Sequence, residues 1–165
     1  MTALRSVVYE APGWGLGEVV FRGDVPVHHE MPRDDADRPT AAAETPAQQA
    51  LVDLLVAYFA GERPALADVD LGPTLAWAGV TPFEDRCLRE LQAIPYGETI
   101  SYGELASRAG RERAHRAAGS VCARGTLSLV VPYHRVIRAD GSIGEWGPEG
   151  NAYKLRLLRH EGLHL

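Results

Sequence analysis

The stretch Ser101–Arg124, SYGELASRAGRERAHRAAGSVCAR, decides the fold of the second half of the chain. It opens with a Ser-x-x-Glu capping-box pattern, which predicts a short helix that runs to about Ala109. Gly110 ends that helix, and the Ala- and Arg-rich residues 112–123 predict a second one. Two short helices joined by a tight turn are typical of a helix-turn-helix, and here the second helix carries most of the arginines.

Charge is distributed unevenly along the 165-residue chain. Residues 1–80 hold five basic and twelve acidic side chains, a net charge of −7, whereas residues 81–165 hold twelve basic and ten acidic ones, a net charge of +2. The total of −5 excludes a protein that binds nucleic acid or membrane with its whole surface. Within residues 108–138, however, seven arginines stand against one acidic residue, Glu112. Such a cluster attracts phosphate backbones, although a solvated helix face is the commoner reason for an arginine run.

The two cysteines, Cys87 and Cys122, are too few for a disulfide framework and stand in no metal-ligand spacing. His28 and His29 have no cysteine nearby, so we expect no metal and no cofactor. The most apolar run, residues 50–60, is about half of the ~20 residues that span a bilayer. We therefore expect a cytoplasmic protein that makes no contact with a membrane.

Residues 1–78 predict a small N-terminal α/β domain. Short antiparallel strands are indicated by apolar and β-branched residues at 4–9, 18–21 and 25–28. Residues 31–43, rich in Pro, Asp and Ala, indicate a loop. The sequence Thr-Pro-Ala-Gln at 45–48 is a capping box with proline at the first helical position, and it predicts the start of a helix. Residues 62–80 are loop-like and mark the junction with a second domain at 79–165.

The second domain is expected to be mainly helical. Thr81–Glu84 is another capping box, and it opens a helix with an apolar stripe. Residues 127–131 are apolar and favour a β-strand. A final helix is expected at about residues 152–160, with Leu155 and Leu158 facing inward.

Several motifs recur in one order and spacing over residues 81–162. They are Thr81-Pro82-Phe83, Ile94-Pro95-Tyr96-Gly97-Glu98-Thr99-Ile100-Ser101-Tyr102, Arg116-Ala117-Ala118-Gly119, Val131-Pro132-Tyr133-His134-Arg135-Val136 and Leu157-Leu158-Arg159-His160-Glu161-Gly162. Together they resemble the DNA-binding domain of the 6-O-alkylguanine-DNA alkyltransferases. The resemblance implies an α+β fold, with ribonuclease H-like strands plus a helix in a small N-terminal α/β part. A mainly helical, winged helix-turn-helix-like DNA-binding domain then follows.

Members of that family bind the minor groove, flip the damaged guanine into a pocket and transfer its alkyl group to the cysteine of a Pro-Cys-His-Arg motif. This chain has Pro132-Tyr133-His134-Arg135, so a tyrosine stands at the acceptor position. The resemblance implies that Arg116 replaces the flipped base in the stack and that Tyr102 belongs to the pocket. It also implies that His134 and Glu161 match the hydrogen-bonded pair that activates the thiolate.

The matching residues define two expected surfaces. The residues expected to bind DNA are Arg116, Tyr102, Arg113, Ala117, Gly119, Arg124 and Arg135. The residues expected to line the lesion pocket are Tyr102, Tyr133, Val136, Trp146 and Gly147. Taken alone, Arg116 is typical of a solvated helix arginine and Tyr102 of a core tyrosine, but the matching context favours the DNA roles. An inserted side chain offsets part of the cost of base flipping.

Tyr133 is a poor substitute for the acceptor cysteine. A phenol of pKa ~10 is harder to ionise than a thiol of pKa ~8.5, and it is a harder nucleophile toward an sp3 carbon. We therefore expect no catalytic residue, and expect His134 and Glu161 to remain as a vestigial pair that joins the active-site strand to the final helix. Cys122 lies ~240° around its helix from Arg116, so we expect it in the core and not as a replacement acceptor.

A retained fold with an aromatic residue at the acceptor position resembles the alkyltransferase-like proteins. These bind alkylated guanine without repairing it and pass the site to nucleotide excision repair. They usually carry tryptophan at this position and lack the N-terminal part, so this chain departs from their pattern on both points. It departs from the wider family at Gly125-Thr126, where Asn-Pro is common, and at Gly147, where many relatives have Ser.

The first hypothesis is a non-catalytic sensor of DNA damage that binds 6-O-alkylguanine in double-stranded DNA, flips the lesion and signals it for repair. Its expected partners are alkylated DNA and nucleotide excision repair proteins, and the sensor is expected to be a monomer associated with the nucleoid when bound to DNA. One alternative is an active or residual alkyltransferase that uses Tyr133 or Cys122. The other is a decayed scaffold without a DNA role, whose partner surface is the acidic N-terminal part.

Overall fold

The computed structural model describes residues 2–34, 38–144 and 150–165 of the chain. None of the helices in these ranges is long and apolar enough to cross a membrane. Among the same residues, no three His, Cys, Asp or Glu side chains gather into a group that could hold a metal ion.

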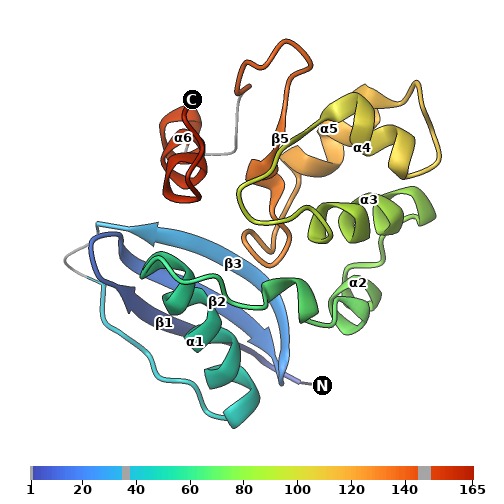
Figure 1. Ribbon diagram of the computed structural model, residues 1–165. Helices are drawn as coiled ribbons and strands as arrows, with labels where there is room; N and C mark the ends of the chain where they lie inside the picture. The colour runs from blue at the N-terminus through green and yellow to red at the C-terminus, as the bar shows by residue number, and fades with distance from the viewer. Residues whose placement is uncertain (1, 35–37, 145–149) are drawn as a thin grey trace. The chain divides into compact units, whose positions relative to one another are not determined.

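The chain folds as two compact units. The first contains residues 1–79 together with Thr126–Ser128, and the second contains residues 80–125 and 129–165. Each unit has its own sheet and its own helices (Figure 1). The fold is therefore mixed α+β, as the sequence predicts, with an antiparallel sheet in the first unit and a mainly helical second unit.

The sheet of the first unit has three antiparallel strands in the order β1-β2-β3. They are β1 (Leu4–Ala11), β2 (Gly15–Arg22) and β3 (Val25–Arg33). Alternate residues of β2 are buried, Val19 and Phe21 among them, as expected when a sheet has one covered face. Helix α1 (Pro46–Phe59) packs against β1 and buries Leu55 and Tyr58 (Figure 1).

Two parts of the first unit are more ordered than the sequence predicts. Strand β3 continues to Arg33, into the segment expected to be a loop, because Arg33 pairs with Leu16 and Met31 is buried. The expected loop at 62–80 contains the 3-10 helix η1 (Leu66–Asp68) and helix α2 (Gly72–Ala78). Proline in the first turn of α2 suits a helix start as well as a loop, which explains the wrong prediction.

The segment Thr126–Ser128 pairs with β3 in the first unit. The backbone N–H of His29 donates to the carbonyl of Thr126 at 2.7 Å, and Leu127 forms a single parallel bridge with His29. The strand expected at residues 127–131 does not form beyond such bridges. Leu129 has a φ of 75°, in the left-handed region, and this conformation interrupts an extended strand.

The second unit packs helices around a small parallel pair of strands. Its helices are α3 (Pro82–Gln92), α4 (Tyr102–Arg108), α5 (His115–Ala123) and α6 (Gly150–His160). Strand β4 (Ile100–Ser101) pairs with β5 (Val136–Ile137), which directly follows the 3-10 helix η2 (Tyr133–Arg135). Helices α4 and α5 form the predicted helix-turn-helix, α3 packs on both, and α6 contacts η2 (Figure 1).

The helix starts agree only in part with the capping boxes expected from the sequence. At α3 the box is complete, because Thr81 accepts from the N–H of Glu84 and the Glu84 side chain accepts from the N–H of Thr81. At α4, Ser101 caps the helix, but the Glu104 side chain pairs with Arg108 instead of closing the box. At α1 the box is also incomplete, since the side chain of the capping-box glutamine accepts from the N–H of Glu44.

Two expectations about helices of the second unit are wrong. Helix α5 begins at His115 and not at residue 112, because residues 111–114 form a turn closed by the N–H of Ala114 on the carbonyl of Arg111. On α6, Leu155 is only half-buried, and the inward position one turn before Leu158 is taken by Lys154, which is fully buried. The helix itself forms as predicted, but the inward face was read from apolar residues alone, and a lysine is rarely fully buried.

Candidate functional site

The exposed face of the helix-turn-helix carries several of the residues expected to contact DNA. Helix α5 buries Ala118, Val121 and Cys122 and exposes Arg116 and Ala117 on its opposite side. Arg113, in the turn before α5, is exposed and Gly119 is half-buried. This division follows from the helical period, since residues three and four positions apart share a face. Arg116 is the single arginine of α5, so the expectation that the second helix carries most of the arginines is wrong: Arg113 lies in the turn before it and Arg124 just beyond its end.

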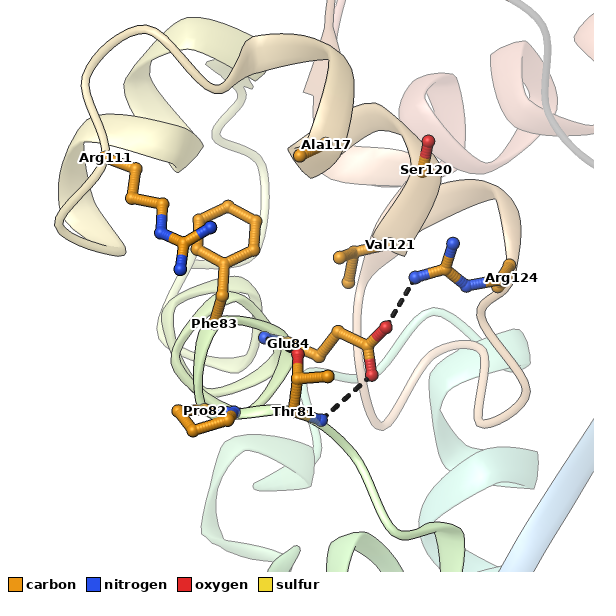
Figure 2. A pocket seen from close by; sticks show the side chains of 9 residues that line it. All are labelled: Thr81, Pro82, Phe83, Glu84, Arg111, Ala117, Ser120, Val121 and Arg124. Carbon is orange, nitrogen blue, oxygen red and sulfur yellow. Dashed lines mark hydrogen bonds and ion pairs between the residues drawn. The ribbon is translucent and has the colours of Figure 1, made fainter.

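Arg124 lies at the end of α5 beside the first turn of α3. Its guanidinium is 2.5 Å from a carboxylate oxygen of Glu84, whose other oxygen accepts the N–H of Thr81 (Figure 2). The two residues line one pocket with Ser120 and Arg111, and the guanidinium of Arg111 lies 4.8 Å from the ring centroid of Phe83. Arg124 is exposed, but an acidic neighbour offsets part of its charge.

Arg135 was expected to bind DNA, and its position corrects that expectation. Its side chain is buried, with 8% of the residue's surface exposed. The guanidinium donates to both carboxylate oxygens of Glu161, at 2.9 and 3.0 Å, and to the carbonyl of Ile94 at 2.7 Å. A guanidinium held in this way cannot reach a phosphate, so Arg135 has a structural role inside the second unit.

His134 and Glu161 form the buried pair that the resemblance implied. Nε2 of His134 lies 2.6 Å from an oxygen of Glu161, and both side chains are fully buried. The other Glu161 oxygen also accepts the N–H of Gly97 at 2.9 Å. The carboxylate therefore ties together the turn after α3, η2 and the end of α6.

The protonation states of this pair follow from its surroundings. Burial raises the pKa of Glu161, but hydrogen bonds and charge from His134 and Arg135 outweigh burial and lower this pKa well below its ordinary value. Burial lowers the pKa of His134, although its bond to Glu161 acts in the opposite direction. A neutral imidazole beside an ionised carboxylate must donate through Nε2, so Nδ1 carries the lone pair.

Tyr133, which the resemblance places at the acceptor position, stands at the start of η2. The residue is buried, and its ring lies directly against the backbone of Gly125, just beyond the C-terminal end of α5. Val136, another expected pocket residue, is buried in β5 opposite Ile100. Trp146 and Gly147 lie outside the described residues.

The ring of Tyr102 packs near Gly119, Lys154 and Gly144. A Cβ on Gly119 would lie 3.8 Å from the Tyr102 ring, and the amino group of Lys154 lies 5.8 Å from its centroid. A Cβ on Gly144 would lie 3.7 Å from the phenol oxygen. Burial raises the pKa of the Tyr102 hydroxyl. The ring is thus half-buried between α5 and the chain near Gly144.

Sequence reasoning missed Lys154, the single lysine of the chain. Its buried amino group donates to the carbonyls of Val136, at 2.6 Å, and Ile143, at 2.8 Å. Burial lowers its pKa to about 8. Lys154 therefore joins β5 to the chain before residue 145, next to Tyr102. Its uniqueness in a chain with sixteen arginines was the signal that could have drawn attention to it.

Both cysteines are buried in the second unit, as expected for core residues. Burial raises the pKa of Cys122 to about 12, although the Lys154 charge acts in the opposite direction. Burial also raises the pKa of Cys87 to about 11. Neither thiol is poised to ionise near neutral pH.

Comparison with known proteins connects this geometry to a family. The family model described as 6-O-methylguanine DNA methyltransferase, DNA binding domain, matches residues 82–163. A Thermus thermophilus relative named DNA base-flipping protein is 44% identical over 107 residues, which cover 64% of this chain and 67% of the relative. The Salmonella typhimurium methylated-DNA–protein-cysteine methyltransferase is 42% identical over 112 residues, 68% of this chain and 62% of that protein.

A solved structure resembles nearly the whole chain. The crystal structure of Mycobacterium tuberculosis OGT in complex with DNA is 33% identical, with a TM-score of 0.73, and the match covers 95% of this chain and 92% of that one. The likeness therefore includes the N-terminal unit as well as the helix-turn-helix.

Proposed function

Because the chain belongs to the 6-O-methylguanine-DNA methyltransferase family, we propose that it binds duplex DNA containing 6-O-alkylguanine, flips that base and holds it without accepting the alkyl group. One observation carries the proposal: Tyr133 is buried at the acceptor position, beside an intact His134–Glu161 pair. The pair that would activate a thiol is present, but the side chain at position 133 carries a phenol in place of a thiol.

The chemistry of alkyl transfer supports a binding protein over an enzyme. Transfer to an sp3 carbon needs an ionised and polarisable nucleophile. The phenol of a tyrosine ionises at a pKa of ~10, against ~8.5 for a thiol, and its oxygen is the harder nucleophile.

No other side chain in the described residues replaces the missing thiol. Cys122 and Cys87 are both buried, and burial raises their pKa values to about 12 and about 11. Cys122 also lies on the buried side of α5, whereas Arg116 lies on the exposed side. A thiol that is neutral and turned into the core cannot attack a flipped base.

The DNA contacts are assigned to the exposed face of the helix-turn-helix. Arg116 projects from the first turn of α5, where it can enter the stack as the guanine leaves, and Arg113 lies beside it for a phosphate. Tyr102 and Tyr133 are assigned to the walls of the lesion pocket. The printed name of the Thermus relative, DNA base-flipping protein, supports the flipping step.

A protein that recognises the lesion and leaves it chemically unchanged must act through other proteins. We assign the repair itself to partners that recognise the protein–DNA complex, of which the nucleotide excision repair proteins are the proposed class. The proposed sensor acts as a monomer, in the cytoplasm and at the nucleoid when bound to DNA.

The decisive experiment is a binding titration with two duplexes that differ only in one 6-O-methylguanine, followed by the intact mass of the protein. We expect tighter binding of the methylated duplex and an unchanged protein mass. A mass increase of one methyl group would instead establish an alkyltransferase. Absence of binding to either duplex at low salt would favour a scaffold without a DNA role.

A further inference from the structure

The ring of Tyr133 lies so close to Gly125 that any side chain at position 125 would overlap it. A Cβ on Gly125 would lie 2.4, 2.5 and 2.6 Å from Cζ, Cε2 and Cε1 of the tyrosine ring. Carbon atoms that are not bonded attract best at about 3.5–4.0 Å, so these distances are severe overlaps. The glycine is therefore required by the space that the ring takes.

Backbone conformation does not explain this glycine. Eleven glycines of the described residues have a positive φ, and Gly125 is not one of them. An alanine at position 125 would thus meet no conformational penalty of the left-handed kind. Its N–H donates to the carbonyl of Cys122 at 3.2 Å, which holds the residue against the end of α5. The steric contact with Tyr133 is the feature left to account for it.

The tyrosine ring has little freedom to move away. Tyr133 is 4% exposed, and its neighbours His134 and Val136 are fully buried. The N–H of Tyr133 donates to the carbonyl of Val131 at 2.9 Å, and Pro132 restricts the backbone before it. In a close-packed interior, a displaced ring must displace other side chains.

We propose that Gly125 is the positioning residue for Tyr133 and that it sets the shape of the lesion pocket. Because position 125 has no side chain, the ring folds back onto the C-terminal end of α5 and forms a fixed aromatic wall. The identities of residues 125 and 133 are then coupled: the tyrosine ring needs a glycine opposite it, and the glycine is needed because of the ring. The statement about the pocket rests on the proposed function, whereas the steric coupling does not.

The coupling is tested by a double-mutant cycle in thermal unfolding of the full chain. Gly125→Ala should lower Tm by about 3–10 °C, because overpacking forces the ring out of place. In the Tyr133→Ala background the same substitution should lower Tm little or raise it, since the ring is gone. Gly103→Ala is the matched control: its Cβ would meet the Ser101 hydroxyl at an ordinary 3.8 Å, and no loss of Tm is expected.

Additive effects of Gly125→Ala and Tyr133→Ala would overturn the proposal. If Gly125→Ala alone does not fold, a folded double variant supports the proposed coupling. If Tyr133→Ala folds and the double variant does not, the coupling is overturned.

A second measurement separates positioning from stability. The ratio of Kd for unmodified duplex to Kd for the 6-O-methylguanine duplex should fall about tenfold in Gly125→Ala, measured well below its Tm, with Kd for unmodified DNA unchanged. If the unfolding cycle shows the coupling and the Kd ratio of Gly125→Ala is nevertheless unchanged, the proposed role of Gly125 in the pocket is overturned. If the parent protein shows no preference for the lesion, the proposed function fails, and the unfolding cycle still decides the coupling.

Discussion

Nε2 of His134 and a carboxylate oxygen of Glu161 lie 2.6 Å apart, with both side chains fully buried, and Tyr133 directly precedes His134 in the chain. The pair is neutral at the imidazole and ionised at the carboxylate, because burial lowers the pKa of His134 and its partners lower the pKa of Glu161. Such a pair can accept a proton from a neighbouring thiol. In this chain it has no thiol to serve, and it holds η2 to the end of α6.

Tyr133→Cys should give the protein a residue that accepts the alkyl group. A thiol ionises more readily than a phenol, and His134 follows it directly in the chain as a base. We expect the variant to gain one methyl group from 6-O-methylguanine duplex, detected by intact mass and located at position 133 by peptide mapping. Tyr133→Ser is the control and should gain nothing, because an alcohol stays protonated. An unmodified Tyr133→Cys protein that still binds the lesion would contradict the assigned role of the pair.

Glu161→Gln should destabilise the protein by about 3–5 kcal/mol, because it leaves the buried Arg135 guanidinium without its counter-charge. Urea unfolding measures this loss. Glu98→Gln, an exposed glutamate in the same turn region as Gly97, is the matched control and should change stability little. Since the folded pKa of Glu161 is lowered, its contribution is present above an ordinary glutamate pKa of about 4.3 and is lost as the pH falls below that value. Equal stability of the two variants would contradict this role.

His29 should make the first unit sensitive to acid. Its Nδ1 lies 2.7 Å from the carbonyl of Ser128 and its Nε2 lies 2.6 Å from the Tyr9 hydroxyl, an arrangement that satisfies a neutral ring. Burial, opposed by the bond to Ser128, lowers its pKa to about 4. Because the unfolded chain then binds more protons, stability is full above about pH 6.5 and falls by about 3 kcal/mol toward pH 4.

The check is the free energy of unfolding of the His29→Gln variant measured across this pH window. The variant should lose the part of the pH dependence that comes from His29, while His134 contributes equally to parent and variant. His28→Gln, an exposed neighbour whose charge is the smallest of the three contributions to the pKa of His29, is the control and should keep most of the parental slope. Parallel pH profiles for the parent and His29→Gln would contradict the prediction.

Arg116→Ala should reduce the preference for alkylated DNA more than general DNA binding. Without the inserted side chain, the gap left by the flipped base is unfilled, and we expect the ratio of the two Kd values to fall about tenfold. Arg113→Ala is the comparison, because the loss of a phosphate contact lowers affinity for both duplexes alike. An Arg116→Ala variant that discriminates as well as the parent would remove the assigned flipping role.

Glu84→Gln should tighten binding to modified and unmodified duplex alike. The substitution keeps a residue that can complete the capping box with Thr81, but it removes the charge that lies 2.5 Å from Arg124. The released guanidinium can then bind a phosphate, so the slope of log Kd against log salt should steepen by about 0.9. Arg124→Ala in the Glu84→Gln background should abolish the gain. Unchanged salt dependence in Glu84→Gln would show that Arg124 does not contact DNA.

Elements with strong local signals were predictable from the sequence. Helices α1, α3 and α4 begin at Thr, Thr and Ser caps as expected, because a cap acts within one turn of the backbone. Helix α2 was missed, since Gly-Pro suits a loop and a helix start equally well. The start of α5 was placed three residues early, because no side chain caps it.

The sequence by itself determined that this chain has a helix-turn-helix and that no cysteine stands at position 133. These are facts of residue identity and of local helical period. Only the tertiary structure decided that Arg135 is buried on Glu161, that Lys154 lies beneath Tyr102, and that Gly125 makes room for the Tyr133 ring. The reason is physical: burial and pairing of long side chains depend on which distant segments pack together, and local sequence does not encode that directly.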